Sequence, residues 1–209
     1  KLFWRGSNSN CFTSCDHGRV SEGQQSWGEC FQTYDCEEPW TAANWLATPR
    51  GRLVNLSRSV ASIDARLTGK SQPMAAELWD FLVHANLTDT RVSHLDQSDY
   101  SFAINVDGTG SGDRVYWQML TGSVVLVQDS PWVSWLVGCV GDAAAMVPLE
   151  HYIPVRFDLA DLVEKLEWLR EHDAEAQFLA DSSERWARKF LTYDWVLFYL
   201  DRAVRRYAG

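Results

Sequence analysis

A glycine-rich segment in the middle of the chain has residues whose types and spacing suit the binding of an anion. Gly108, Gly110 and Gly112 follow the apolar run 101–106 and precede a second apolar run, 123–128. This order predicts a strand, a loop, a short helix and a second strand. Loop glycines let backbone N–H groups approach a ligand, and a helix N-terminus adds about half a unit of positive charge. The segment therefore predicts a phosphate site, with an ordinary tight turn as the alternative.

The basic residues near this loop support the same interpretation. Arg114 would lie in the first helical turn, where a guanidinium opposes the helix dipole unless it serves a nearby anion. Arg5, Arg50 and Arg52 are further candidates, and a solvated surface charge is the alternative for each. We expect Arg50 and Arg52 at a turn that follows Pro49.

Other kinds of chemistry have little support in the sequence. The loop spacing Gly-x-Gly-x-Gly is not the dinucleotide fingerprint Gly-x-Gly-x-x-Gly, so no nicotinamide or flavin site is predicted. The five histidines form no nucleophile relay, and no Gly-x-Ser-x-Gly elbow is present. The acidic run 171–173 ends an amphipathic stretch and is predicted to be a solvated face rather than a metal site. We therefore predict no metal and no cofactor.

Four of the five cysteines lie in a short polar segment: Cys11, Cys15, Cys30 and Cys36. Packing would hold such a segment poorly, whereas two disulfides, each worth about 3 kcal/mol, would stabilise it. Disulfides persist in oxidising compartments, so this interpretation places the protein in the secretory pathway. A zinc site or free thiols are the alternatives, although no paired Cys-x2-Cys knuckle is present. Cys139 is predicted to be a small buried hydrophobe.

Two N-glycosylation tripeptides, which begin at Asn55 and Asn86, agree with a secretory route. The best apolar run, 131–149, is interrupted by Gly141 and Asp142, so no segment is predicted to cross a bilayer. The sequence has no initiator Met and no signal peptide, and we interpret it as a fragment of a longer protein. Membrane attachment would then depend on an N-terminal anchor outside this sequence.

The composition fits one globular unit that does not bind nucleic acid. The chain has 209 residues, 46% of them hydrophobic, which is enough for one sizeable core. Its formal net charge of -9 gives no basic field that could attract a nucleic-acid backbone or an anionic membrane. The chain also has 11 tryptophans, and aromatic faces are common platforms for sugars and bases.

Apolar patterns predict the elements that must position these residues. A short buried strand is expected at 2–4, followed by a cysteine-rich insertion at about 8–40. The run 41–56 is compatible with a helix broken by a proline and a glycine, and 74–87 has a clear helical period. Apolar strands joined by a crossover helix are expected to pair in parallel and to be buried on both faces, so the fold class is α/β.

The C-terminal part is predicted to be one more strand and three helices. The strand is expected at 151–155, and the first helix at an N-cap formed by Asp158. A second helix should span about 174–190, and a third should begin after Asp194. We expect these last elements to form a helical cap over the sheet.

Four segments follow one another in the order of a known set of motifs. The first, 1–7, reads Lys-Leu-Phe-Trp-Arg-Gly-Ser, and the second, 49–54, reads Pro-Arg-Gly-Arg-Leu-Val. The third, 105–123, runs from Asn-Val-Asp-Gly through Ser-Gly-Asp-Arg to Leu-Thr-Gly-Ser, and the fourth, 151–173, opens on His-Tyr-Ile-Pro-Val. Together they resemble the C-terminal part of glycosyltransferase family 90, which includes capsule xylosyltransferases and protein O-glucosyltransferases. The cysteine segment is not covered.

The resemblance implies a fold and a set of ligand contacts. Members of this family have the GT-B arrangement, in which a C-terminal Rossmann-like domain holds a UDP-sugar. An N-terminal domain, which would lie outside this sequence, supplies the acceptor contacts and the catalytic carboxylate. The resemblance implies that Ser7 and Arg50 contact the diphosphate and that Arg114 pairs with the phosphates. The loop residues implied to line the donor nucleotide are Gly108, Thr109, Gly110, Ser111, Gly112, Asp113 and Arg114.

The chemistry that the resemblance implies is inverting and metal-independent. A carboxylate would deprotonate the acceptor hydroxyl while arginines and loop amides stabilise the UDP leaving group. The sugar would be xylose or glucose and the acceptor a glycan or protein hydroxyl, in the lumen of the Golgi or endoplasmic reticulum. Without the N-terminal domain, the chain alone is expected to have no transfer activity. The alternative is an inactive, disulfide-stabilised module that binds a glycan or a nucleotide.

Overall fold

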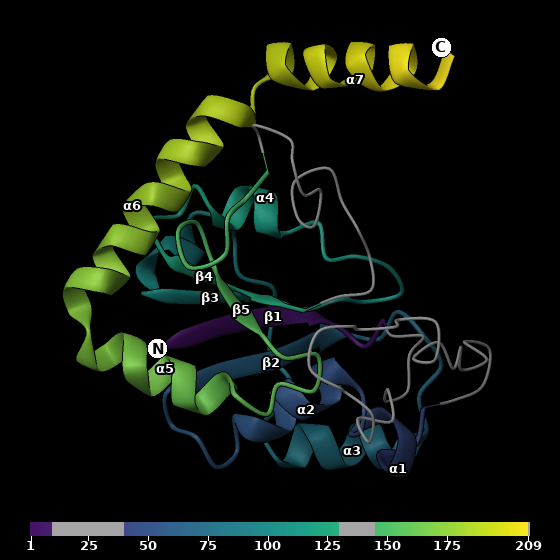
Figure 1. Cartoon of the computed structure of the whole chain (residues 1–209). Coiled ribbons are helices and arrows are strands. Elements are labelled where there is room, and N and C mark those ends of the chain that lie inside the picture. Colours follow the sequence, from purple (N-terminus) through teal and green to yellow (C-terminus); the bar gives the residue numbers. More distant parts are fainter. Residues whose placement is uncertain (10–39, 130–144, 209) are drawn as a thin grey trace, which may run out of the picture.

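The protein is built on one parallel sheet with helices on both faces (Figure 1). The computed structural model describes residues 1–9, 40–129 and 145–208, and within them the strand order is β2-β1-β3-β4-β5. The strands are β1 (Leu2–Ser7), β2 (Ile63–Gly69), β3 (Phe102–Asn105), β4 (Val124–Gln128) and β5 (Ile153–Val155). The helices are α1 (Ala42–Trp45), α2 (Pro49–Leu56), α3 (Ala76–His84), the 3-10 helix η3 (Asp96–Asp99), α4 (Val115–Gln118), α5 (Leu162–Glu171), α6 (Asp173–Phe190) and α7 (Tyr193–Ala208). The predicted α/β class is confirmed, with a Rossmann-like sheet.

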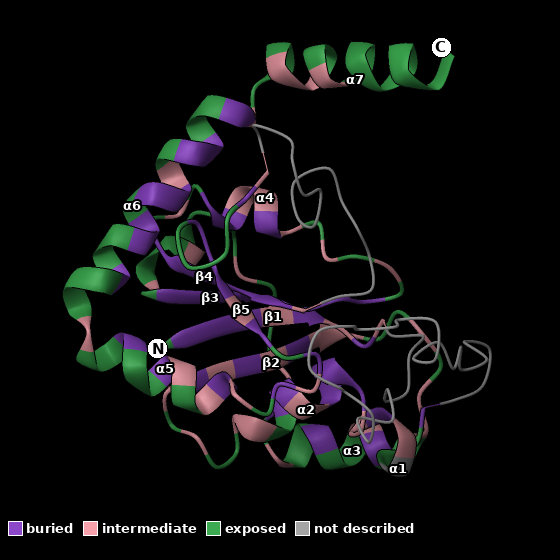
Figure 2. Cartoon of the chain, viewed as in Figure 1, coloured by how far each residue is buried: buried purple, intermediate pink, exposed green. Residues whose placement is uncertain are grey.

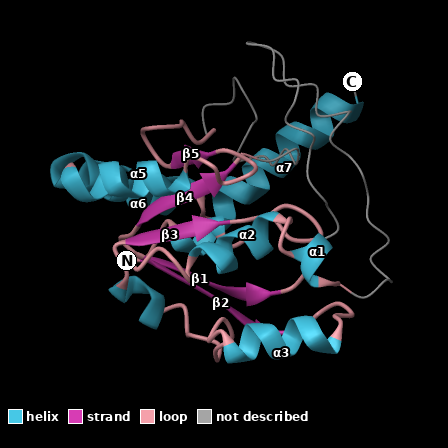
Figure 3. Ribbon diagram, turned by 90° about the horizontal axis from the view of Figure 1, so that it is seen from below, coloured by secondary structure: helices cyan, strands magenta, loops and turns pink. Residues whose placement is uncertain are grey.

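Buried residues line both faces of the sheet, and the central strands in Figure 2 are coloured mostly as buried. On one face Trp4, Ile104 and Leu126 join a core that α2, α3, α5 and the start of α6 complete. On the other face Val125 and Val127 pack with α4 and the end of α6. Figure 3 places α5 and α6 near β4 and β5, and α3 near β2 at the opposite edge. All residues of β3 and β4 are buried, as expected for strands covered on both faces.

The edge strand β2 is the element that the sequence analysis missed. Its residues Ile-Asp-Ala-Arg-Leu alternate between buried and partly exposed, which is the two-residue period of a strand with one covered face. Asp64 and Arg66 occupy the partly exposed positions, so the strand lacks the continuous apolar run that marks β3 and β4.

The chain order of the strands creates a switch point at the centre of the sheet. After β1 the chain forms β2 on one side and then returns to form β3 on the other side. Sheets of this kind bind ligands outside the carboxyl ends of the strands, where the strand order reverses. The β1–β3 ladder joins only Leu2 with Phe102 and Phe3 with Ala103 in the described residues. The two strands therefore separate toward their carboxyl ends.

The helical predictions are partly confirmed. The stretch 41–56 is interrupted, as predicted, but the break lies at 46–48, before Pro49. Pro49 is the first residue of α2, where the N-terminal turn needs no N–H, and Gly51 lies inside this helix. Thr48 caps this turn by accepting a hydrogen bond from the backbone N–H of Gly51, so Arg50 lies in a helix and not in a loop. The helix α5 begins after Asp161, one turn later than predicted, while Asp158 accepts from the N–H of Ala160 in the preceding turn.

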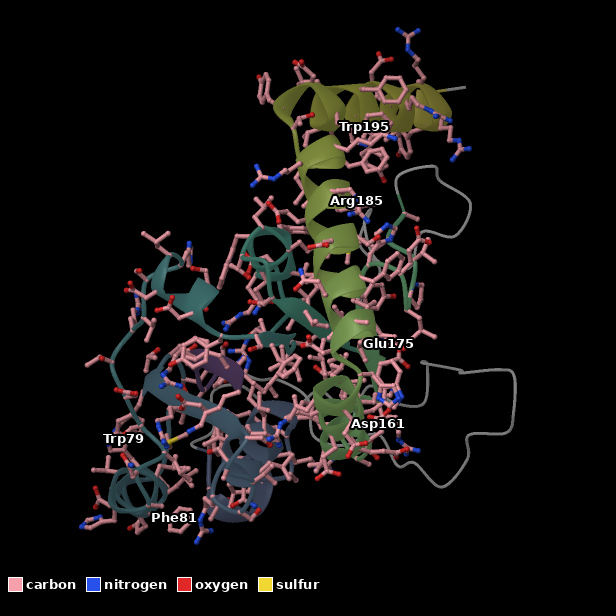
Figure 4. The ribbon with its side chains drawn as sticks, turned by 90° about the vertical axis from the view of Figure 1, so that its left-hand side faces the viewer. Trp79, Phe81, Asp161, Glu175, Arg185 and Trp195 are labelled. Carbon is pink, nitrogen blue, oxygen red and sulfur yellow. The ribbon has the colours of Figure 1, made fainter. Side chains whose placement is uncertain are left out.

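The last helix does not cap the sheet. The helices α5 and α6 supply buried residues to the core, as predicted, but no residue of α7 is buried. The helix projects from the end of α6, where Trp195 lies 4.8 Å from Phe190 between ring centroids (Figures 1 and 4). In the described part of the chain, no helix is both long enough and apolar enough to span a bilayer.

Candidate functional site

Three of the predicted site residues meet at the switch point, although they are far apart in the sequence. Ser7 ends β1, Arg50 lies in the first turn of α2, and Arg114 immediately precedes α4. Trp4 of β1 lies between them in the fold, and its ring centroid is 5.6 Å from Cζ of Arg50 and 5.5 Å from Cζ of Arg114. The structure therefore brings two guanidinium groups to the carboxyl ends of β1 and β3.

Arg50 is buried and ties the separated ends of β1 and β3 together. Its Nε donates to the carbonyl oxygen of Asp107 at 2.8 Å, and Nη1 donates to the carbonyl oxygen of Ser7 at 3.0 Å. Further bonds reach the Ser9 hydroxyl at 2.5 Å and the Val106 carbonyl at 3.4 Å. These acceptors are neutral, so they satisfy the donors of the guanidinium without cancelling its charge.

Arg114 is held more loosely. Its Nη1 donates to the carbonyl oxygen of Arg5 at 2.5 Å, on the stretch of β1 that has already separated from β3. Within residues 1–9, 40–129 and 145–208 this is the one hydrogen bond of the guanidinium, which has five N–H donors. Most of the Arg114 donors therefore remain available to a ligand.

The electrostatics of the arginine pair favour an anion. Burial, and then the charge of Arg114, lower the pKa of Arg50 well below its ordinary value, to about 9, while Asp107 and Asp113 oppose the shift. Burial likewise lowers the pKa of Arg114, against the charge of Asp113. Among the described residues, no carboxylate forms an ion pair with either arginine. A bound anion would offset the cost of burying these two cations.

The other two basic candidates lie in different surroundings. Arg5 forms ion pairs of 2.9 Å with Asp64 and Asp89, so its charge is already compensated. Arg52 is partly exposed, and the one hydrogen bond of its side chain within the described residues is a long 3.5 Å contact with the carbonyl oxygen of Asp158. Within the described residues, neither Arg5 nor Arg52 combines burial with the lack of an ion pair, as Arg50 does.

The glycine-rich loop is held by hydrogen bonds among residues 105–112. The N–H of Gly112 donates to Oδ1 of Asp107 at 2.9 Å, and the Gly112 carbonyl accepts from Nδ2 of Asn105 at 3.0 Å. The N–H of Gly108 donates to the carbonyl of Gly110 at 3.0 Å. Two of the predicted phosphate-binding amides are thus engaged inside the loop.

The remaining loop amides and the helix after them limit what the loop offers a ligand. The N–H groups of Thr109, Gly110 and Ser111 make no hydrogen bond within the described residues, and Thr109 and Ser111 are exposed. Asp113 is also exposed and lies one residue before Arg114. The helix α4 has only four residues, so the dipole predicted to attract an anion is that of a single turn. The arginines therefore carry more of the anion-binding character than the loop does.

Two amide side chains that position the site were not singled out in the sequence. Gln128 accepts from the N–H of Asp107 at 3.0 Å and donates to the carbonyl of Phe157 at 2.7 Å, which links the carboxyl ends of β3, β4 and β5. Asn8 accepts from the N–H groups of Ser71 and Gln72 at 2.7 and 3.1 Å. Both amides directly follow or end an apolar strand, and this position is the signal that could have identified them.

His151, from the His-Tyr-Ile-Pro-Val motif, does not belong to this site. It precedes β5 and therefore lies at the amino end of that strand, whereas the arginines lie at the carboxyl ends of the neighbouring strands. Its Nδ1 accepts from the N–H of Val147 at 2.9 Å, and burial lowers its pKa. The neutral ring fixes the turn before β5.

The predicted disulfide sites lie outside the described residues, whereas the predicted glycosylation sites lie on the surface. The disulfide candidates Cys11, Cys15, Cys30 and Cys36 lie outside the described residues, as does Cys139. Asn55 and Asn86, the glycosylation candidates, are both exposed. Asn86 has a φ of 55° just after α3, in the left-handed region that Asn tolerates better than most residues.

The fold and the site define a Rossmann-like domain with a cationic centre at its switch point. The profile described as "Glycosyl transferase family 90" matches residues 33–209, and the chain belongs to this family. The match begins after β1, so the motif that contains Trp4 and Ser7 lies outside it.

The relatives include named protein O-glucosyltransferases. Protein O-glucosyltransferase 2 of Danio rerio is 33% identical over 163 residues, which cover 76% of this chain and 30% of the relative. Human protein O-glucosyltransferase 3 is 35% identical over 109 residues, covering 52% of this chain and 20% of the relative. Human protein O-glucosyltransferase 1 is 26% identical over 179 residues, covering 81% and 43%. The chain thus spans less than half the length of each of these relatives.

Proposed function

We propose that this chain binds the UDP-sugar donor of a glycosyltransferase that transfers the sugar to a protein hydroxyl. The observation that carries this proposal is the pair of Arg50, which is buried, and Arg114, which is partly buried, at the switch point, where neither forms an ion pair with a carboxylate among the described residues. A diphosphate supplies compact negative charge that suits two converging guanidinium groups. Because the named relatives are O-glucosyltransferases, we favour glucose over xylose and protein over glycan.

The arginine pair suggests a role in the chemical step as well as in binding. When the bond between the sugar and UDP breaks, negative charge grows on the departing diphosphate, and fixed cations in a partly buried site stabilise it. Arg114 has donors that are free to follow this charge, whereas Arg50 is held by four acceptors. We propose that these cations replace a metal ion and that transfer inverts the anomeric centre. The carboxylate that deprotonates the acceptor is not assigned to a residue of this chain.

The organisation of the whole enzyme is part of the proposal. The relatives are at least twice as long as the segments that match this chain. We propose that residues 1–209 form the donor-binding domain of a GT-B enzyme and that a separate domain supplies the acceptor contacts and the base. The 209-residue chain should then bind donor but show no transfer.

Calorimetric titration of UDP, UDP-glucose and UDP-xylose into the chain tests the proposed function. We expect saturable binding of UDP in EDTA, tighter binding of UDP than of UMP, and a preference for UDP-glucose over UDP-xylose. UMP lacks the second phosphate, so it forms fewer charge-assisted hydrogen bonds with the arginines. A folded chain that shows no binding of UDP would overturn the proposal.

The compartment is proposed on separate grounds. We propose a location in the lumen of the secretory pathway, with two disulfides among Cys11, Cys15, Cys30 and Cys36. Non-reducing peptide mass mapping of protein from a secretory host should find these four cysteines paired and glycans on Asn55 or Asn86. Four free thiols, or a bound zinc ion, would contradict the disulfide assignment.

A further inference from the structure

Trp4 occupies an unusual position for a core side chain. It is 1% exposed and belongs to the main hydrophobic core, together with Leu2 on the same face of β1. Its ring nevertheless lies within 6 Å of the Cζ atoms of both Arg50 and Arg114. One side chain therefore connects the apolar core with both cations of the site.

The placement of the Trp4 ring depends on Gly6. The indole N–H of Trp4 is buried and has no hydrogen-bond partner in the described residues, so no polar contact orients the ring. A Cβ atom on Gly6 would lie 2.5 Å from Cζ2 of Trp4, closer than real side chains approach. The absence of a side chain at position 6 thus leaves the space that the indole occupies.

An aromatic ring can hold a guanidinium group without neutralising its charge, which a carboxylate cannot do. The face of an indole attracts a guanidinium through the ring quadrupole, and the attraction strengthens when water is excluded. The ring carries no net charge, so it holds Arg50 and Arg114 without neutralising them. The Asp64 and Asp89 carboxylates, by contrast, compensate the charge of Arg5.

We infer that Trp4 is a positioning residue for the donor diphosphate, because its ring holds Arg50 and Arg114 in the geometry that grips the phosphates. The inference rests on the proposed function, since it assigns Trp4 a role in the same site. It also explains why Gly follows two residues after Trp4 in the first motif of the chain.

The test compares UDP affinity in Trp4 variants with that in a matched core variant. Trp4→Leu should weaken UDP binding about tenfold, which is the loss expected from a desolvated cation–π contact. Trp4→Phe keeps a ring face and should recover most of the affinity. Trp45→Leu is the control, because Trp45 is 0% exposed, lies in the same core and also has an unpartnered indole N–H. It has no arginine over its ring in the described residues and should leave UDP affinity unchanged.

Two further measurements separate positioning from general loss of packing. The double variant Trp4→Leu/Arg114→Ala should lose less UDP affinity than the product of the two single losses, because part of the effect of the ring acts through Arg114. Gly6→Ala should weaken UDP binding at least about threefold, although it removes no polar atom and no ring. This variant decides the question if Trp4→Leu does not fold.

The UDP titrations distinguish a failure of the proposed function from a failure of the inference about Trp4. If wild type fails to bind UDP, the proposed function falls and this inference falls with it. If wild type binds UDP but Trp4→Leu or Gly6→Ala binds equally well, the inference about Trp4 is overturned and the proposed function stands. Equal losses in Trp4→Leu and Trp45→Leu would also overturn it, because they would reflect packing alone.

Discussion

Two groups of arginines lie on and beside the same strand, β1, and their surroundings differ. Arg5 projects toward the β2 side of the sheet and pairs with Asp64 and Asp89, both at 2.9 Å. Arg50 and Arg114, at the β3 side, bond to carbonyl oxygens and a hydroxyl and lie against the Trp4 ring. Carboxylates compensate the charge of Arg5, whereas neither Arg50 nor Arg114 forms an ion pair with a carboxylate within the described residues.

The difference separates a structural arginine from a ligand-binding one. Backbone carbonyls and an aromatic ring satisfy the geometry of a guanidinium but supply no counter-charge, so a place for an anion remains. Arg5 contributes to both arrangements, because its side chain joins the ion pairs while its carbonyl accepts from Arg114. Replacing its side chain should therefore affect stability, and replacing Arg114 should affect ligand binding.

The largest expected effect is the loss of UDP binding in Arg114→Ala. A charge-assisted pair with a phosphate contributes about 1.5 to 3 kcal/mol, so we expect binding to weaken by ten- to a hundredfold. Arg114→Lys should recover only part of this, because an ammonium cannot reproduce the planar fork. Calorimetric titration of UDP measures both variants. Arg52→Ala is the control, and an unchanged affinity in Arg114→Ala would show that the side chain merely holds β1.

The second expected effect is the loss of stability in Arg5→Met. This change leaves Asp89 unpaired and Asp64 with only Arg66, at 3.4 Å. Because Asp64 is largely buried, we expect the free energy of unfolding to fall by about 2 kcal/mol in urea denaturation. The UDP affinity of the folded variant should change less than about twofold, since the Arg5 carbonyl is retained. A large loss of UDP affinity would show that Arg5 also contributes to ligand binding, and the distinction between the two groups of arginines would be wrong.

Much of this fold could be predicted from the sequence, because most of its strands are buried on both faces. The uninterrupted apolar residues of β3 and β4 give a strong signal, whereas β2 alternates with charged residues and was missed. The position of β2 makes the β1–β3 junction a switch point, so the sequence could not locate that point. The sequence also could not predict that α7 leaves no residue buried, because an apolar helical face does not specify what it packs against.

The site was only partly predictable, since burial and pairing depend on residues distant in the chain. The sequence singled out Arg50 and Arg114, but not the compensation of Arg5 by Asp89, which is 84 positions away. It also predicted that the loop amides bind a phosphate, whereas Asp107 accepts from the N–H of Gly112 and Asn105 donates to its carbonyl, so part of the loop backbone is already used. Whether these residues bind the donor stays a prediction.

A third experiment tests whether the hydrogen bonds within the glycine-rich loop help to hold Arg114 in place. A Cβ atom on Gly112 would lie 2.4 Å from Oδ1 of Asn105, whereas one on Gly110 would meet nothing within 4 Å. We expect Gly112→Ala to lower the free energy of unfolding by about 1 to 2 kcal/mol and to weaken UDP binding several-fold, since Arg114 follows two residues later. Gly110→Ala, the matched control, should change neither. Equal behaviour of the two alanine variants in urea denaturation would show that these hydrogen bonds are unimportant.

The smallest expected effect is a pH dependence of stability that only the uncompensated arginines should show. The folded-state pKa of Arg50, about 9, lies well below the ordinary value of an arginine, which the unfolded chain retains. Between these values the unfolded chain binds a proton that the folded chain has released, so raising the pH favours the folded state. Below pH 8 both states are protonated, and the contribution of Arg50 does not vary with pH.

Comparison of wild type with Arg50→Met measures this contribution together with the coupling between the charges of Arg50 and Arg114. The difference between their free energies of unfolding should shift by about 1 kcal/mol in favour of wild type between pH 8 and pH 10. Urea denaturation at pH 8, 9 and 10 measures it. A constant difference between wild type and Arg50→Met would mean that Arg50 keeps its proton in the folded state. The uncompensated charge would then be better tolerated than its burial implies, and the case for an anion at this site would be weaker.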